Sequence, residues 1–506
     1  MANDHPHDSH DPPWTRDATP HARSPLATRL RTEVCVIGAG IAGLTTAYEL
    51  AGEGRSVVVL DDGPIGGGMT SRTTAHLATA IDDRYWEIAR IHGTVGARLA
   101  AASHAGAIDR IEEIATREGI DADFRRVDGF LFRGPEQPLE LLQRELEAAH
   151  EAGLADVELL ARSALPEFDT GPCLRFPRQG QLHPMKYLSG LADAFEKRGG
   201  LIFCGTHAEG FEGKPLCVTT DRDASVIADV VVVATNVPIN DRFAIHTKQA
   251  PYMTYVVAAR VPSGVVPVAL YWDTLDPYHY VRVAEGVDGH DLLVVGGEDH
   301  KTGQQHRSDD RFARLEAWAR LHFPAIGAIE RRWSGQVMET IDGLAFIGRN
   351  PGDDAVYVVT GDSGMGMTHG TLAGQLIADL VVGRPSRFAR LYDPARKPVR
   401  AGRDFLAETA NVAAQYRDWV TPGEVSSAAE VPPGSGAIVR RGLHKLAVHR
   451  DASGTLHERS AVCPHLGCIV RWNDTEKTWD CPCHGSRFAA EGRVISGPAN
   501  SDLAHA

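Results

Sequence analysis

Short apolar runs separated by glycine-rich turns predict alternating strands and helices in the first part of the chain. Residues 32–37 (TEVCVI) form one such run, which is followed by Gly38, Gly40 and Gly43 and then by an apolar stretch of helical character. A second run, residues 56–60, ends at Asp61. Strand, turn, helix and strand in this order predict an α/β domain in which the helix N-terminus faces a phosphate group.

The three glycines and the aspartate have separate roles in such a unit. Gly38 permits the tight turn, Gly40 lets a pyrophosphate approach the backbone, and Gly43 lets the helix pack on the strand. A carboxylate at Asp61 is placed to accept hydrogen bonds from a ribose. These residues predict a dinucleotide site, although the motif alone does not choose between NAD and FAD.

Two later segments contain further residues suited to binding the cofactor. Residues 66–77 (GGGMTSRTTAHL) follow the acid, and residues 356–368 run from an apolar strand into glycines that open a helix. The N-terminus of that helix presents unpaired N–H groups and a partial positive charge, which would stabilise an anionic reduced ring. An ordinary strand-to-helix turn is the alternative. Residues 228–234 predict a buried parallel strand that ends beside the cofactor at Thr235.

With these motifs, the chain from about Glu33 to about Gly383 resembles the flavin-dependent amine and D-amino-acid oxidase superfamily, which includes glycine oxidase and sarcosine oxidase. The resemblance implies FAD as cofactor and oxidation of an amine or amino acid C–N bond by hydride transfer to FAD. The residues that it implies for FAD binding are Gly38, Gly40, Gly43, Asp61, Arg72, Thr73, Thr74, Thr235, Gly361, Asp362, Gly364, Gly366, Met367 and Thr368.

The same resemblance suggests residues for the substrate. Amino-acid oxidases of the superfamily anchor the substrate carboxylate with an arginine and a tyrosine, and Tyr278, Tyr280 and Arg282 are the candidates, with surface or core roles as the alternative. His76 lies where some relatives attach the flavin covalently. Hydrogen bonding or packing is the other interpretation of this histidine.

The last fifty residues contain two short clusters of cysteine and histidine, CPHLGC at residues 463–468 and CPCHGS at residues 481–486. Two thiolates and two imidazoles are what a [2Fe-2S] centre needs when two histidines replace two cysteines on one iron. Zinc also accepts mixed sulfur and nitrogen ligands. Six candidate ligands in two matched loops are more than a zinc site uses.

These clusters resemble the Rieske iron-sulfur domain. The resemblance implies Cys463, His465, Cys481 and His484 as cluster ligands, and a disulfide between Cys468 and Cys483. High-potential members carry a tyrosine two residues after the motif serine. In this chain the serine is Ser486, and Phe488 occupies the position of that tyrosine. One of two hydrogen bonds to sulfur is therefore retained, and we expect an intermediate potential.

Length and motif positions predict several parts in this chain of 506 residues. We expect a disordered polar tail over residues 1–28, a discontinuous FAD domain with an inserted substrate domain over 29–400, a helical connector and linker over 401–430, and the Rieske domain over 431–506. The predicted fold is thus an α/β Rossmann-like FAD domain interleaved with an α+β substrate domain and followed by a small all-β domain. Residues 123–132, 252–260, 278–283 and 292–296 are the expected strands of a mixed sheet over the flavin.

The composition and net charge of the chain restrict the kinds of partner that we expect. A net charge of −14 argues against nucleic acid. No apolar run is long enough for a membrane span and no signal peptide is visible, so we expect a cytoplasmic protein. Cys35, Cys173, Cys204 and Cys217 lack ligand spacing and are expected in the core.

The two predicted cofactors together suggest a converter from two-electron oxidation to one-electron delivery. We expect a dehydrogenase that passes electrons from FAD through the cluster to an external protein or quinone. An oxidase that forms hydrogen peroxide is one alternative, although residues 291–297 lack the lysine that some oxidases place over the flavin. A redox sensor or carrier without an organic substrate is the other. All flavin motifs lie before Thr421, so we expect FAD binding not to need the C-terminal domain.

Overall fold

The glycine-rich turn lies at the end of a sheet whose central strands are parallel. The computed structural model describes residues 10–18, 20–240, 245–286, 288–304, 309–397 and 401–506. In the first sheet the strand order is β16-β17-β10-β1-β2-β7, with β9 and β8 paired beside β10. Its strands are β1 (Leu30–Ile37), β2 (Val57–Leu60), β7 (Leu201–Phe203), β8 (Ala208–Glu212), β9 (Leu216–Thr220), β10 (Ser225–Val233), β16 (Phe346–Arg349) and β17 (Val356–Thr360).

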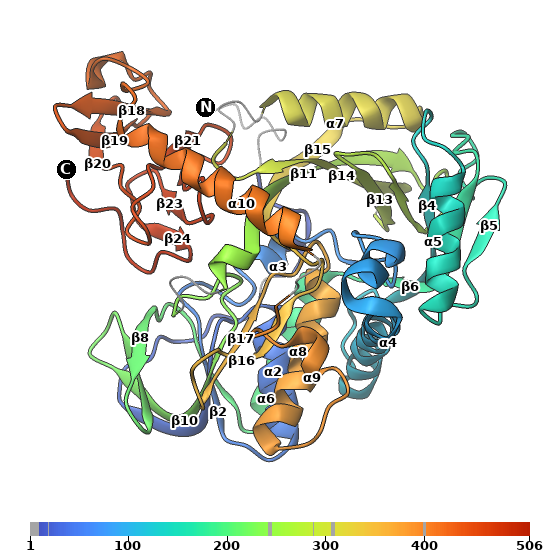
Figure 1. Ribbon diagram of the computed structural model, residues 1–506, viewed down its shortest axis with the longest axis horizontal. Coiled ribbons are helices and arrows are strands. Elements are labelled where there is room, and N and C mark those ends of the chain that lie inside the picture. Colours follow the sequence, from blue (N-terminus) through green and yellow to red (C-terminus); the bar gives the residue numbers. More distant parts are fainter. Residues whose placement is uncertain (1–9, 19, 241–244, 287, 305–308, 398–400) are drawn as a thin grey trace.

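Three helices pack beside these strands (Figure 1). They are α2 (Ile41–Gly52), α6 (Pro184–Lys197) and α8 (Gly366–Val382). The strands β1, β2, β7, β10 and β17 pair in parallel and are rich in valine, as expected for strands buried on both faces. The strands β1 and β17 of this sheet are more than three hundred residues apart in sequence.

A second, mixed sheet lies next to the first. Its order is β15-β11-β14-β13-β12-β4-β6-β3, with β5 beside β6, and β4 and β12 are its one parallel pair among the described strands. The strands are β3 (His76–Leu77), β4 (Arg125–Phe132), β5 (Glu158–Leu160), β6 (Cys173–Gln181), β11 (Gln249–Pro262), β12 (Leu270–Asp273), β13 (His279–Ala284), β14 (His290–Lys301) and β15 (Ile329–Thr340). All four predicted strand regions fall in this sheet.

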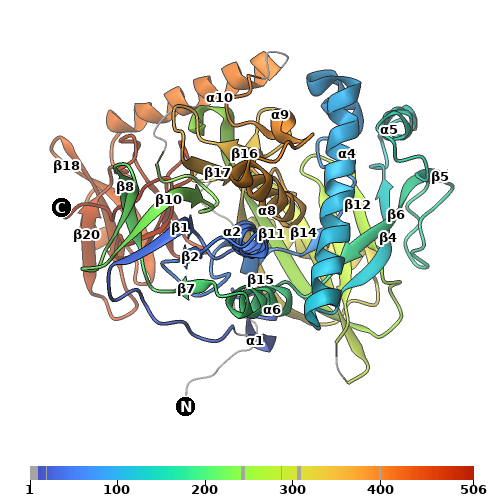
Figure 2. The same ribbon diagram turned by 90° about the horizontal axis from the view of Figure 1, so that it is seen from below.

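The remaining helices of this part surround the two sheets. The long helix α4 lies between α5 and α8, and α7 covers β11 and β14 (Figures 1 and 2). Their bounds are α3 (Met69–Arg72), α4 (Tyr85–Glu118), α5 (Glu140–Glu151), α7 (Asp309–His322) and α9 (Ala389–Tyr392). Three of the four cysteines expected in the core, Cys35, Cys173 and Cys204, are buried, whereas Cys217 is half-buried.

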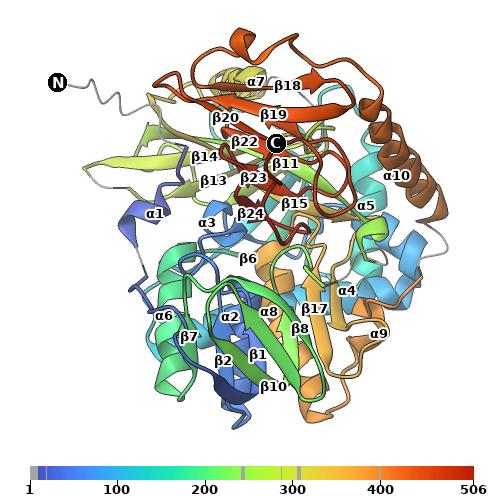
Figure 3. The same ribbon diagram turned by 90° about the vertical axis from the view of Figure 1, so that its left-hand side faces the viewer.

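The C-terminal unit consists of two small antiparallel sheets, in agreement with the all-β prediction. They contain β18 (Ser435–Arg441), β19 (His444–Arg450) and β20 (Leu456–Ser460), and β21 (Arg471–Asn473), β22 (Thr478–Asp480), β23 (Arg487–Ala489) and β24 (Val494–Ser496). The connector before them is α10 (Gly402–Gln415), followed by the 3-10 turns η3 (Tyr416–Trp419) and η4 (Ala428–Glu430). Figure 3 shows this unit in front of β11 and β15.

Part of the expected linker belongs to the C-terminal unit. The Glu424 amide donates to the Ile438 carbonyl at 2.7 Å, and Val425 forms a parallel bridge with Val439. The segment from residue 421 therefore packs on β18 by backbone pairing, which composition did not reveal.

The expected disordered tail is wrong for the residues that the structure describes. Trp14 in α1 (Trp14–Asp17) is 2% exposed, contacts the Trp333 ring edge-on at 5.5 Å and donates its indole N–H to the Ser71 carbonyl at 2.5 Å. Leu26 is buried as well. Burial of these two apolar side chains orders the segment despite its polar composition, while residues 1–9 and 19 lie outside the described part. Among the described helices, none is both long and apolar enough to span a membrane.

Candidate functional site

A cavity of about 640 Å³ opens where the two sheets and the C-terminal unit meet. Its wall contains the predicted residues Gly38, Gly40, Asp61, Arg72, Thr73, Thr74, Thr235, Gly361, Asp362, Gly364, Gly366 and Met367. Twelve of the fourteen residues predicted for FAD therefore surround one space. Gly43 and Thr368 do not line it.

The glycine turn is closely packed, which explains its residue types. Gly38 has a φ of +109°, and a Cβ on it would lie 2.4 Å from the Ala234 carbonyl oxygen at the end of β10. A Cβ on Gly43 would lie 1.8 Å from the Gly38 carbonyl oxygen, so Gly43 brings α2 against the turn. For a Cβ on Gly40 the nearest atom would be the Thr70 hydroxyl oxygen, at 3.0 Å, so the backbone at Gly40 faces the cavity.

Asp61 lies at the carboxyl end of β2. Its carboxylate accepts from the Ala39 amide at 2.6 Å and from the Gly63 amide at 2.8 Å, which orients it on the cavity wall. Burial raises the pKa of Asp61 to about 7. Asp61 lines the cavity, where its carboxylate could also accept from a ribose hydroxyl.

The start of α8 forms another part of the wall. Gly361 and Gly364 have φ values of +73° and +75°, so the turn favours glycine at both positions. Burial raises the pKa of Asp362, which lies between them, to about 6. The Thr368 hydroxyl instead bonds to His104 Nδ1 at 2.9 Å and to the Met365 carbonyl, behind the wall.

Aromatic side chains of the mixed sheet line another part of the cavity. Tyr278, Tyr280, His76 and Trp272 all face it. Both ring nitrogens of His76 are engaged, Nδ1 with the Thr74 hydroxyl at 3.0 Å and Nε2 with the Val281 carbonyl at 3.3 Å. Burial lowers the pKa of His76 to about 3, so the ring is neutral. This arrangement gives His76 a packing and hydrogen-bonding role.

Arg282 does not reach the cavity. Its guanidinium donates to the carbonyls of Ala75 at 3.2 Å and Leu182 at 3.0 Å and lies over the Trp14 ring. The side chain is 3% exposed. The prediction that Arg282 anchors a substrate carboxylate is not supported by this placement: Arg282 lies on the same face of β13 as Tyr280, but the two backbone carbonyls hold its guanidinium away from the cavity.

An acidic residue occupies the place next to these tyrosines. Asp82 lines the cavity and accepts a hydrogen bond from the Tyr278 hydroxyl at 3.1 Å. A Cβ on Gly364 would lie 2.1 Å from the same carboxylate, so Asp82 also touches the turn before α8. Burial raises the pKa of Asp82. It also raises the pKa of Tyr278 well above the usual value, so this phenol remains a donor.

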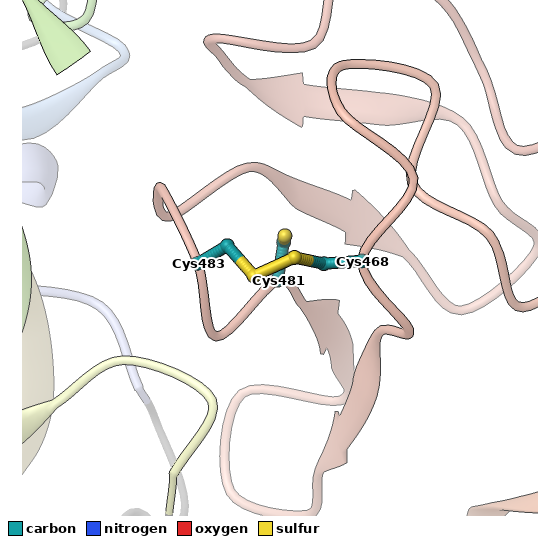
Figure 4. Close-up of side chains that lie close together, drawn as sticks. All are labelled: Cys468, Cys481 and Cys483. Atoms are coloured by element: carbon teal, nitrogen blue, oxygen red, sulfur yellow. A yellow bond between two sulfur atoms is a disulfide. The ribbon is translucent and has the colours of Figure 1, made fainter. Parts of the chain in front are cut away.

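The two cysteine and histidine clusters meet in the C-terminal unit. Cys468 and Cys483 form the predicted disulfide, with Cα atoms 6.5 Å apart, and Cys481 lies beside it (Figure 4). The sulfurs of Cys468, Cys481 and Cys483 lie within 4.8 Å of one another, but two of them are committed to the disulfide. A metal site must therefore use the other side chains.

Those side chains are Cys463, Cys481, His465 and His484. The two thiols are buried and hydrogen-bonded to each other, and this bond lowers the pKa of Cys463. The imidazoles of His465 and His484 lie 5.0 Å apart at an interplanar angle of 86°.

This donor set fits a [2Fe-2S] cluster of the Rieske type. The buried Nδ1 of His484 has no hydrogen-bond partner among the described residues. Burial lowers the pKa of His484 to about 3, so its ring is neutral and can bind a metal. The Ser486 hydroxyl hydrogen-bonds the Cys463 sulfur. Two thiols and two imidazoles thus converge as the cluster requires.

The loop of residues 481–486, called the cluster loop below, packs directly on the cavity wall. Gln336 in β15 lines the cavity and donates from Nε2 to the Gly485 carbonyl at 2.8 Å. His246, in the 3-10 turn η1 (His246–Lys248) before β11, contacts the rings of His465 and His484 at 4.9 and 6.1 Å. One layer of side chains therefore separates the cavity from the cluster loop.

Several of these residues were not found from sequence. Asp82, His246, Gln336 and the wall residues from the C-terminal unit carry no local motif, because their roles arise from contacts between segments far apart in the chain. Glu476, for example, forms an ion pair with Arg72, four hundred residues earlier. Thr70, in contrast, lies inside a segment already singled out, and its hydroxyl accepts from the Ile41 amide at 3.1 Å.

Known proteins share both parts of this architecture. The family described as FAD dependent oxidoreductase matches residues 33–380, and the Rieske [2Fe-2S] domain family matches residues 421–506. The Bacillus subtilis protein YhfW, which is described by name as a Rieske 2Fe-2S iron-sulfur protein, is 31% identical over 93% of this chain and 92% of its own.

Two further relatives match the first part. The gamma-glutamylputrescine oxidoreductase of Escherichia coli is 27% identical over 77% of this chain and 93% of its own. The crystal structure of glycine oxidase from Geobacillus kaustophilus superposes with a TM-score of 0.61 at 20% identity, covering 73% of this chain and 99% of that one. At this identity the structural likeness concerns the fold.

Proposed function

Because this chain belongs to the FAD dependent oxidoreductase family and ends in a Rieske [2Fe-2S] domain, we propose that it oxidises an amine at a C–N bond and delivers the electrons singly, through the cluster, to an external acceptor. When bound, FAD accepts two electrons from a C–H bond next to nitrogen, and a Rieske cluster accepts one at a time. The observation that carries the proposal is Gln336, whose side chain belongs to the cavity wall and also binds the cluster loop.

The charge of the cavity wall beside Tyr278 favours an amine over an amino acid as substrate. Asp82 is an acidic side chain next to the aromatic residues Tyr278 and Trp272, and Arg282 lies behind the wall. A carboxylate with aromatic rings around it attracts a cationic ammonium group. The raised pKa of Asp82 lets its Oδ atoms take the ammonium proton, so that the amine is neutral when it is oxidised.

The absence of a lysine supports a dehydrogenase. No lysine lines the cavity among the described residues, and Lys301 at the end of β14 pairs with Glu408 at 2.6 Å instead. Without such a lysine, reaction with oxygen is expected to be slow. The acceptor of the electrons is then a one-electron carrier protein or a quinone.

Rapid mixing tests this function directly. The full chain is mixed anaerobically with a panel of amines and amino acids while flavin absorbance and the cluster signal are recorded. We expect a cationic amine to bleach the flavin first and the cluster to be reduced afterwards. In the variant Cys463→Ser, which lacks one cluster ligand, bleaching should persist while turnover with a carrier protein stops.

Two results would favour the alternatives. Stoichiometric hydrogen peroxide in air, with the cluster still oxidised, would indicate an oxidase. A flavin that no amine or amino acid reduces, but that a reduced carrier protein does, would indicate a redox sensor or carrier.

A further inference from the structure

The Rieske unit contributes part of the cavity wall that holds the nucleotide motif. Ten of its residues line the same cavity as Asp61 and Arg72, and they come from β22, β23, β24 and the segments beside them. They are Glu476, Thr478, Arg487, Arg493, Val494, Ile495, Ser496, Gly497, Ala499 and Asn500. The other wall residues come from the two large sheets and their loops. The cavity is therefore closed by a domain that the FAD dependent oxidoreductase family match does not include.

A network of ion pairs joins the Rieske unit to the FAD part of the chain at Arg72. Arg72 lies 3.2 Å from Glu476, and the Ser334 hydroxyl donates to the other oxygen of Glu476 at 2.7 Å. The Glu476 side chain is only 6% exposed. On its far side lies Arg487, at 4.0 Å, which is paired in turn with Asp480 at 3.1 Å. Charges of opposite sign alternate along this row, so loss of the Glu476 charge removes the ion pair between Arg72 and the Rieske unit, while Arg487 keeps Asp480.

A second connection lies near Asp61. The Asn500 side-chain amide donates to the carbonyls of Ala208 and Glu209, each at 2.9 Å. His207 donates from Nε2 to the Asn500 carbonyl at 3.3 Å and lies 3.5 Å from Asp62 through Nδ1. Four of these residues, Asp62, His207, Ala208 and Asn500, line the cavity themselves.

We propose that the Rieske unit is one wall of the FAD site and that Glu476 and Asn500 hold this wall in place, so that FAD leaves only when the unit moves. Each connection spans the cavity from a Rieske residue to a residue beside the nucleotide motif. FAD binding and docking of the Rieske unit are then coupled, and each strengthens the other by the same factor. This coupling does not depend on which substrate or acceptor the protein uses.

The rate of FAD release from the full-length holoprotein tests this coupling. The variants Glu476→Gln and Asn500→Ala each remove one connection while keeping the ligands of the cluster. FAD release is followed by the rise of free-flavin fluorescence after dilution, and cluster content by EPR. We expect each variant to release FAD about ten times faster than the unchanged protein, which corresponds to about 1.4 kcal/mol.

The control is Glu458→Gln. Glu458 pairs with Arg441 at 3.0 Å on β20 and β18, away from the cavity, and the substitution makes the same chemical change as Glu476→Gln. It should release FAD at the unchanged rate. Should Glu476→Gln lose its cluster through misfolding, Asn500→Ala decides alone, since the Asn500 side-chain amide bonds the backbone carbonyls of Ala208 and Glu209 and no charged group. FAD release at the unchanged rate in a variant with intact cluster would overturn the proposal.

Discussion

The imidazole rings of His246 and His465 lie edge to face with their centroids 4.9 Å apart. His246 belongs to the FAD part of the chain and is 2% exposed, whereas His465 is one of the two imidazoles predicted to bind the cluster in the Rieske unit. The second ligand ring, that of His484, lies 6.1 Å from the same side chain. Both imidazole ligands are therefore covered by the domain that holds the nucleotide cavity, and we infer that electrons enter the cluster through its histidine side.

His246→Ala should slow electron transfer between the domains. The substitution removes the side chain that packs on both ligand rings, and interiors do not refill such a space without rearrangement. We expect flavin reduction by the amine to keep its rate while cluster reduction becomes severalfold slower, as measured by stopped flow. The control His322→Ala removes an imidazole from α7 that packs on Trp318, away from the cavity and the cluster. Equal rates in His246→Ala and the unchanged protein would argue against entry at this side.

Ser486→Ala should lower the midpoint potential of the cluster. The Ser486 hydroxyl hydrogen-bonds Cys463 and is fully buried. A hydrogen bond to sulfur stabilises the reduced form, and one of about 1 kcal/mol corresponds to a few tens of millivolts for a one-electron couple. Protein-film voltammetry measures the shift. A midpoint that stays constant or rises would show that this hydroxyl does not tune the cluster.

Phe488→Tyr should move the potential in the other direction. Phe488 is fully buried and packs in the core of the Rieske unit with Trp479 and Cys483. A hydroxyl added here restores the donor that high-potential relatives carry, so we expect a rise of a few tens of millivolts. Thermal unfolding of the same variant serves as the control for overpacking, which costs stability without raising the potential.

The sequence predicted local chemistry well and contacts between domains poorly. The glycine turn at Gly38 and the disulfide of Cys468 were predictable because each depends on residues in short, recognisable motifs. The contacts of Arg72 with Glu476 and of Asp82 with Tyr278 were not, because they join segments that the fold alone brings together. The same reason explains Arg282, whose position on β13 was predicted, whereas the carbonyls of Ala75 and Leu182 that bind its guanidinium come from distant segments.

One sequence-based expectation changes as a result. A chain truncated before Thr421 retains every flavin motif, and from sequence alone it should bind FAD as the full chain does. The structure instead makes Glu476 and Asn500 part of the cavity wall. We now expect the truncated chain to bind FAD at least ten times more weakly, by about 1.4 kcal/mol or more, in equilibrium fluorescence titrations. Equal affinities would mean that the wall from the Rieske unit contributes no binding energy.

FAD affinity should depend on pH through Asp61. Burial raises the pKa of this carboxyl to about 7, and ribose hydroxyls donate to its ionised form. FAD therefore favours the ionised state, so its binding releases a proton below pH 7, and affinity rises from pH 6 to pH 8 before it levels off. Asp61→Asn should bind more weakly and lose this dependence. Titrations at several pH values that give parallel curves for both proteins would contradict the role of Asp61.

Asp82→Asn should impair binding of a cationic amine. Asparagine has nearly the same shape and can still accept from the Tyr278 hydroxyl, so the substitution removes charge and leaves the packing in place. Hydrogen bonds to charged groups contribute about 1.5–3 kcal/mol, so KM for a cationic amine should rise at least tenfold. Loss of a proton acceptor would lower kcat as well, most strongly at low pH, where the ammonium form of the amine predominates. The exposed Asp121→Asn is the matched control, and flavin absorbance verifies that both variants keep FAD. A KM that is unchanged for amines, together with improved oxidation of amino acids that carry a free carboxylate, would contradict this role. It would show that Asp82 only repels anions and that the substrate is an uncharged amine.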